Sequence, residues 1–151
     1  MKTYPIHAGE LEEVSVNIGL YSVRDFMGQE LPGLALLLID ARFMEQNADP
    51  EDINYDEVLS VSFGEFISIR NSFYVDTNNC PYAEEFLTKN NIAVNTGLSR
   101  SSGFCRYPLY VLTPEFIEEL KTDTGAAGKN YKTYLDAVEN YDPFRVPNDE
   151  T

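Results

Sequence analysis

The sequence contains no tryptophan, one histidine (His7) and only two cysteines, Cys80 and Cys105. Three potential ligands cannot form a four-ligand zinc site of Cys and His side chains, and the sequence has no C-x-x-C pair. An enzyme that pairs a cysteine with a histidine needs a positioned base, and no pattern fixes the place of His7. We therefore predict no metal, no cofactor and no catalytic residue.

Long hydrophobic runs are also absent, and the longest covers only residues 34–39. A membrane-spanning helix needs about 20 apolar residues, so we predict no membrane segment. The N-terminus lacks the apolar core of a signal peptide. With so few cysteines, this predicts a protein of the reducing cytoplasm, without a structural disulfide.

Basic residues are scarce: 11 Lys and Arg stand against 25 Asp and Glu, which gives a formal net charge of -14. Such a charge repels phosphates and argues against direct binding of nucleic acid. It is compatible with solubility alone, with a partner that has a basic surface, or with a surface that imitates DNA. Residues 43–65 hold seven acids and no Lys or Arg, the acids being Glu45, Asp49, Glu51, Asp52, Asp56, Glu57 and Glu65. We predict an acidic patch formed by Asp49, Glu51, Asp52, Asp56 and Glu57.

Strand patterns come first along the chain and helical patterns later. Residues 14–20 and 58–63 alternate between apolar and polar, whereas residues 34–39 form a short continuous apolar run. Further strands are predicted at 66–70, 72–76 and 104–112, and helices at 81–89, after Thr113 and over 131–141. This order predicts an α+β fold, with a mainly antiparallel sheet of four to five strands and two to three helices packed on one face. We expect a single domain over 1–151, with 34–39 in a central strand and with 1–10 and 143–151 loosely ordered.

Polar turn residues gather around both cysteines. Cys80 precedes Pro81, and a thiol at a helix N-terminus has a lowered pKa, but Glu84 and Glu85 lie one turn away and disfavour a thiolate. Cys80 is thus a candidate nucleophile or a small residue that packs under the helix. Residues 96–103 are small and polar, and with Arg100 they form either an anion-binding loop or a surface loop whose arginine pairs with acids.

Three short motifs are distinctive: DTNNCPYAE at 76–84, TG at 96–97 and SGFCRYP at 102–108. With these motifs the chain resembles an uncharacterised bacterial family of small proteins encoded on conjugative elements and plasmids of gut Firmicutes. The similarity is clearest over residues 73–110. It implies an accessory protein of a mobile element and transfers no catalytic residue. It also implies that one structural unit contains Asp76, Asn78, Asn79, Cys80, Gly103, Cys105 and Pro108. From this region we take as candidate binding residues Asp76, Asn78, Asn79, Cys80, Arg100, Ser102 and Cys105.

Three classes of function follow from these observations. The first is a non-enzymatic interaction protein whose acidic surface binds a protein with a basic surface. The second is a DNA-mimic inhibitor of a host defence nuclease, and the third is a small cysteine-dependent enzyme. The sequence predicts no oligomeric state.

Overall fold

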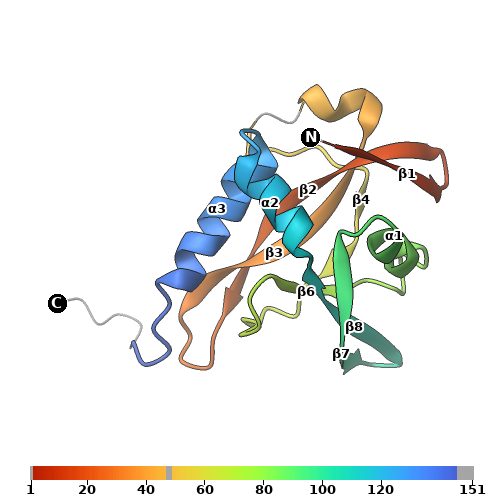
Figure 1. Cartoon of the computed structure of the whole chain (residues 1–151). Coiled ribbons are helices and arrows are strands. Elements are labelled where there is room, and N and C mark those ends of the chain that lie inside the picture. The colour runs from red at the N-terminus through yellow and green to blue at the C-terminus, as the bar shows by residue number, and fades with distance from the viewer. Residues whose placement is uncertain (1, 47–48, 146–151) are drawn as a thin grey trace.

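A computed structural model describes residues 2–46 and 49–145, with side chains described except at 45 and 46. Eight strands and four helical segments follow one another along these residues (Figure 1). In chain order they are β1 (Thr3–Ala8), β2 (Leu11–Arg24), β3 (Glu30–Asp40), the 3-10 helix η1 (Ala41–Gln46), β4 (Glu57–Val58), β5 (Ser60–Val61), β6 (Ser72–Val75), α1 (Ala83–Lys89), β7 (Ala93–Ser102), β8 (Cys105–Leu112), α2 (Pro114–Thr122) and α3 (Ala126–Glu139).

The strands form two four-stranded antiparallel sheets, in the orders β1-β2-β3-β4 and β5-β6-β8-β7. The α+β class and the antiparallel pairing are therefore confirmed. The apolar run at 34–39 lies in β3, an interior strand, and every residue of the run is buried. A run that is apolar on both faces suits a strand that is covered on both faces, which is why the sequence predicted this position.

The two sheets share one segment of chain. The N–H of Leu59 donates to the carbonyl of Leu36 in β3, and the Leu59 carbonyl accepts from the N–H of Asp76, directly after β6. β4 therefore ends the first sheet and β5 begins the second within five residues. The sequence predicted one continuous strand here and one sheet. The structure corrects both points, because the N–H and the carbonyl of Leu59 are hydrogen-bonded to different segments, β3 and the residue after β6.

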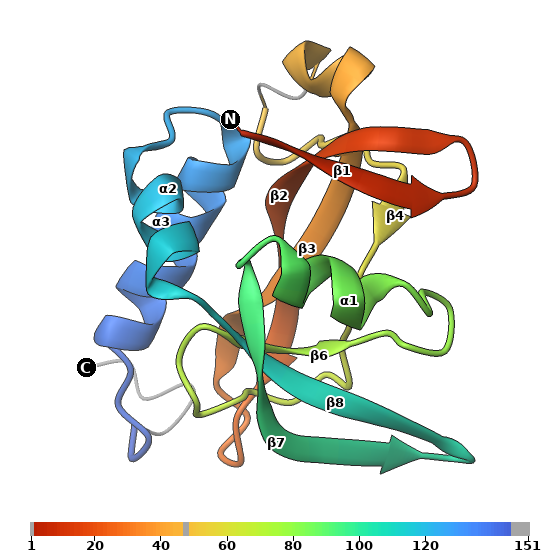
Figure 2. The same cartoon turned by 45° about the vertical axis from the view of Figure 1, so that its right-hand side comes forward.

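The helices cover the sheets from two sides. α2 begins at Pro114, and the Thr113 hydroxyl accepts a hydrogen bond from the N–H of Phe116, as the Thr-Pro pair predicted. α3 packs against β2, β3 and α2, while α1 lies beside β7 and close to β1 (Figure 2). Rings of Tyr4 in β1 and Phe86 in α1 meet edge to face at 6.2 Å. One buried apolar cluster includes side chains from both sheets and all three α-helices.

Two expectations about local order are wrong. Residues 1–10 were expected to be loosely ordered, but Thr3–Ala8 pairs with β2 because Tyr4 and Ile6 bury their side chains in the core. Residues 66–70 were expected to form a strand, but they are irregular, and only Glu65 bridges to Arg24. Residues 143–145 form a turn, and 146–151 lie outside the described residues.

Candidate functional site

The predicted acidic patch lies in the connection between η1 and β4 and includes the first residue of β4. Its members, Asp49, Glu51, Asp52, Asp56 and Glu57, are all exposed. Asp49 also organises this connection, since its carboxylate accepts a hydrogen bond from the N–H of Glu51 at 3.0 Å. The carboxylates are thus presented to solvent by a segment with some internal order. Glu45, the first acid of the run, has a side chain outside the described part of the structure.

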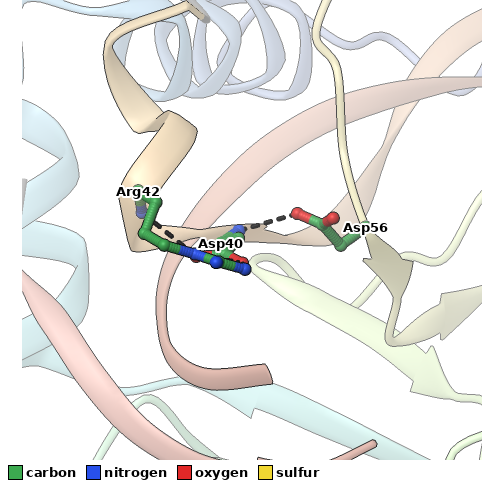
Figure 3. Close-up of polar contacts among 3 residues, drawn as sticks. All are labelled: Asp40, Arg42 and Asp56. Atoms are coloured by element: carbon green, nitrogen blue, oxygen red, sulfur yellow. Dashed lines mark hydrogen bonds and ion pairs between the residues drawn. The ribbon is translucent and has the colours of Figure 1, made fainter. Parts of the chain in front are cut away.

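One edge of this acidic patch is joined to the end of β3 (Figure 3). The Asp56 carboxylate accepts a hydrogen bond from the N–H of Asp40 at 2.7 Å, and the N–H of Asp56 donates to the carbonyl of Leu38 at 2.8 Å. Asp40 in turn accepts from the Arg42 guanidinium at 2.5 and 3.1 Å. These bonds from Arg42 lower the pKa of the Asp40 carboxyl, which stays ionised in its buried position.

Arg42 also connects the acidic patch with a second group of acids. Its side chain is exposed, its pKa is raised first by Asp40, and Glu12 and Asp56 raise it further. A shallow cavity beside Arg42 is lined by Glu10, Glu12, Glu13 and Asp40. The acidic surface therefore extends from the patch to the turn between β1 and β2. Sequence reasoning missed this extension, because the two groups of acids are about 40 residues apart in the chain and meet only through the pairing of β2 with β3.

Two exposed aromatic side chains stand within the same surface. Phe43 is 46% exposed and Tyr55 is 55% exposed, and both line a shallow cavity together with Ile39, Asn54 and Asp56. The Arg42 guanidinium lies 5.4 Å from the centre of the Phe43 ring. Aromatic residues near the carboxylates could have been noticed in the sequence at 43 and 55, but their exposure could not.

The Asp76–Cys80 segment is a tight turn. The Asp76 carboxylate accepts hydrogen bonds from the N–H and side-chain amide of Asn79, at 3.3 and 2.9 Å, and its carbonyl accepts from the N–H of Cys80. Asn78 and Asn79 are exposed. The hydroxyl of Thr77 approaches the carbonyl of Arg106 at 3.5 Å, which places the turn beside β8. The turn is hydrogen-bonded within itself, as expected of Asp and Asn at such positions.

Cys80 does not cap the following helix. α1 begins at Ala83 with Tyr82 at the cap position, and Cys80 is only 2% exposed. Its thiol donates to the carbonyl of Val58 at 3.4 Å. Burial raises the pKa of the Cys80 thiol, and Glu57 and Asp76 raise it further, whereas a hydrogen bond with Tyr82 lowers it. The neutral thiol is therefore favoured, and the geometry suits packing rather than nucleophilic attack.

Arg100, Ser102 and Cys105 lie in the hairpin of β7 and β8. Residues 96–103 were expected to form a loop, but residues 96–102 belong to β7, whose pairing with β8 is interrupted by a bulge between Asn95 and Ser99. Gly97, at φ +87°, supplies the left-handed backbone that this bulge uses. The turn itself is only Gly103 and Phe104, between the paired residues Ser102 and Cys105. Small polar residues thus mark an irregular edge strand here.

Arg100 is held by two neighbours. Its guanidinium donates to the Glu65 carboxylate at 2.6 and 3.3 Å, and it stacks 4.3 Å from the centre of the Phe63 ring. These bonds raise the pKa of Arg100. The surface-pair interpretation of Arg100 fits this arrangement better than the anion-binding one. It also corrects the charge count for residues 43–65, because Glu65 is compensated from the hairpin.

The structure does not join all predicted residues into one site. The 76–80 turn adjoins β8, but Cys80 points into the core, whereas Cys105 is half-buried at the hairpin tip and both thiols are free. Within residues 2–46 and 49–145, no three His, Cys, Asp or Glu side chains are placed to hold a metal ion. No helix in that part of the chain is long and apolar enough to cross a membrane.

Comparisons with known proteins give one result. A family model described as Domain of unknown function (DUF4313) matches residues 41–124, which is more than half of the chain and runs from η1 to just past α2. The match includes the acidic patch and the whole second sheet. No curated protein and no solved structure matches significantly. The chain therefore belongs to the uncharacterised family described as Domain of unknown function (DUF4313).

Proposed function

We propose that this chain is a non-catalytic binding protein whose acidic patch takes a protein partner with a basic surface. The observation that carries the proposal is the state of the five patch carboxylates. All are exposed, and none takes part in the ion pairs found among the described residues. Their charge is available to a partner, and exposed charge of one sign accelerates association with the opposite sign.

The exposed aromatic residues support a specific contact in addition to attraction. Phe43 and Tyr55 stand beside the carboxylates, and protein interfaces are enriched in aromatic side chains. An arginine of a basic partner can pair with a carboxylate and stack on a ring at the same time. This combination of charges and rings is what we propose the partner recognises.

A DNA mimic is the second candidate, and one observation favours it. The acids Glu10, Glu12 and Glu13 continue the acidic surface past Arg42, so carboxylates are spread over more than one connection. A DNA mimic needs such a continuous spread, since duplex DNA carries one charge per about 1.7 Å of its axis. The mobile-element context and the reducing cytoplasm that the sequence suggested belong to this proposal.

The test is a comparison of two variants with the same net charge. One neutralises the patch with Asp49→Asn, Glu51→Gln, Asp52→Asn and Glu57→Gln, and keeps Asp56 because its carboxylate holds the end of β3. The control neutralises four exposed glutamates on the helices, with Glu85→Gln, Glu115→Gln, Glu118→Gln and Glu139→Gln. The partner is isolated from the native host with the wild-type chain, and its association rate is measured with all three proteins.

We expect the patch variant to associate about tenfold more slowly at low salt, and the control to stay within about twofold of wild type. High salt should abolish the difference, because the screening length falls to about 3 Å at 1 M. Equal rates for the two variants would show that only total charge matters and would refute the patch. Competition by double-stranded DNA for the partner would select the DNA-mimic candidate.

A further inference from the structure

One cavity among the described residues lies away from the acidic patch and is lined by residues of both sheets. Its volume is about 370 Å³. Buried residues, including Leu34 and Phe73, form its floor, whereas Ile69 and Leu98 at its mouth are 39% and 55% exposed. Strand β7, the loop after β5 and the ends of β2 and β3 supply its walls. We call it the aromatic cavity.

Aromatic rings form a prominent part of its lining, together with aliphatic side chains such as Leu34 and Ile69. Six Phe and Tyr side chains take part, namely Tyr21, Phe63, Phe66, Phe73, Tyr74 and Tyr134. Phe63 meets Tyr74 edge to face, with ring centres 5.4 Å apart and planes at 78°. Rings held at such angles can offer faces and edges to a further ring, with one face of Phe63 already covered by Arg100.

Three hydroxyls of the lining, those of Tyr21, Tyr134 and Ser72, are already hydrogen-bonded within the protein. The Tyr21 hydroxyl is hydrogen-bonded to Ser60, at 3.0 Å to its hydroxyl and 3.2 Å to its carbonyl. The Tyr134 hydroxyl accepts from the N–H of Asn71, and the Ser72 hydroxyl donates to the carbonyl of Ile69. At these three hydroxyls a polar ligand would find few replacements for the bonds to water that it loses.

The mouth of the aromatic cavity carries no excess charge. Arg100 and Glu65 both line it, and they neutralise each other in a bidentate ion pair. A charged ligand would meet a counter-charge that is already paired, so an uncharged one is favoured. Size sets the remaining limit, because a cavity of about 150 Å³ is enough for benzene and ligand pockets begin at about 300 Å³.

We propose that the aromatic cavity binds a small, uncharged aromatic molecule of two or three rings. This site is independent of the acidic patch. The rings of the lining provide the contacts, and the Arg100–Glu65 pair closes one side of the mouth without attracting ions.

The probe is the neutral dye N-phenyl-1-naphthylamine, followed by its fluorescence, which is not obscured because the chain has no tryptophan. Ile69→Lys places a charge in the lining, and Val94→Lys makes the matched change on β7 at a residue that is 46% exposed and outside the lining. Leu98→Lys repeats the first change at a second, more exposed lining position. Circular dichroism and thermal unfolding verify that each variant is folded.

We expect saturable binding of one dye per chain, weakened about tenfold or more by Ile69→Lys and by Leu98→Lys, and changed less than about twofold by Val94→Lys. The anionic analogue 8-anilinonaphthalene-1-sulfonate should bind about tenfold more weakly than the neutral dye. Equal losses in lining and control variants, or dye binding that does not saturate, would refute the site. Equal or tighter binding of the anionic dye would refute the preference for an uncharged ligand.

Discussion

The acidic patch and the β7–β8 hairpin lie at opposite ends of the molecule and have opposite character (Figures 1 and 2). The patch places five acids within nine residues, whereas no Asp or Glu occurs from Phe86 to Pro114, a stretch that includes the hairpin together with Lys89, Arg100 and Arg106. One end can attract a basic surface, whereas at the other end the hairpin carries no carboxylate of its own and the Glu65 carboxylate beside it is paired with Arg100. A net charge of -14 is therefore a poor description of either end.

The two ends also differ in how they are anchored. The patch is joined to β3 through Asp56, Asp40 and Leu38. The hairpin is joined to β6 over only three paired residues and is tied at its side by the Arg100–Glu65 pair. Measurements of unfolding free energy can show whether both ends depend on the same folded core.

The largest effect is expected from Leu59→Ala. Leu59 is completely buried, and its backbone bonds to both sheets. Removing its side chain should lower the free energy of unfolding by about 2–5 kcal/mol. The measurement is urea denaturation, and Val61→Ala, at a half-buried neighbour, should cost less than half as much. Similar losses for the two variants would mean that the junction at Leu59 is not special.

The second-largest loss of stability is expected from Gly128→Ala. A Cβ atom at 128 would lie 2.0 Å from the carbonyl oxygen of Asp123, a backbone atom that cannot move aside easily. We expect a loss of about 1–3 kcal/mol in unfolding free energy. Gly125→Ala is the matched control, because its Cβ would meet only the Asp123 carboxylate at 3.5 Å. If Gly128→Ala unfolds at the urea concentration of the control, then α3 is not packed as closely as described.

Tyr131→Phe should cost about 1 kcal/mol at neutral pH, because the Tyr131 hydroxyl donates to the Asn71 side-chain oxygen at 2.8 Å. Burial raises the pKa of Tyr131 to about 12, and the neighbouring Tyr134 contributes to the rise. A raised pKa in the folded state means full stability below about pH 10 and a progressive loss from there to about pH 12.

The Phe variant should therefore lose less stability than wild type between neutral pH and pH 12. Part of the alkaline loss should remain, since the pKa of Tyr110 is also raised to about 12 by burial and by Glu84. Thermal unfolding across this pH range measures both slopes. Parallel curves for the two proteins would show that Tyr131 titrates normally.

The smallest effects are expected from surface charges, and their signs should differ between the two ends. Neutralising the acidic patch with the four substitutions described above should leave the unfolding free energy within about 0.5 kcal/mol or raise it slightly, because like charges are removed. Arg100→Gln should lower it by about 0–1 kcal/mol, since its partner Glu65 is well exposed. Thermal unfolding at low and high salt compares the two, and a large loss in the patch variant would contradict a purely binding role.

The sequence predicted most elements but not how they are grouped. Local patterns predicted the Thr113 cap, the apolar run in β3 and the three-or-four spacing of α3. Such patterns depend on neighbouring residues alone, so they can be recognised without knowing the fold. The division into two sheets depends on which partners the N–H and carbonyl of Leu59 choose, and no pattern of side chains encodes that choice. For the same reason, residues 96–102 resembled a loop, because a bulged edge strand needs few apolar side chains.

In the candidate sites, too, local features were predictable and contacts between distant residues were not. Exposure of the acidic patch was predictable, because the patch is a run of neighbouring acids. The pairing of Arg100 with Glu65, and the meeting of Glu12 with Arg42, join residues 35 and 30 positions apart. The aromatic cavity is assembled from even more distant segments, so composition could predict its rings but not their convergence.

The segment shared by the two sheets sets a requirement on relatives of this chain. The family match starts at residue 41, yet β4 inside the match pairs with β3 outside it, and Leu59 bonds to Leu36. The matched region therefore begins inside a sheet, and in this chain β4 depends on the preceding β3 for its pairing. We expect relatives that share this fold to carry, before the matched region, a hairpin equivalent to β2 and β3.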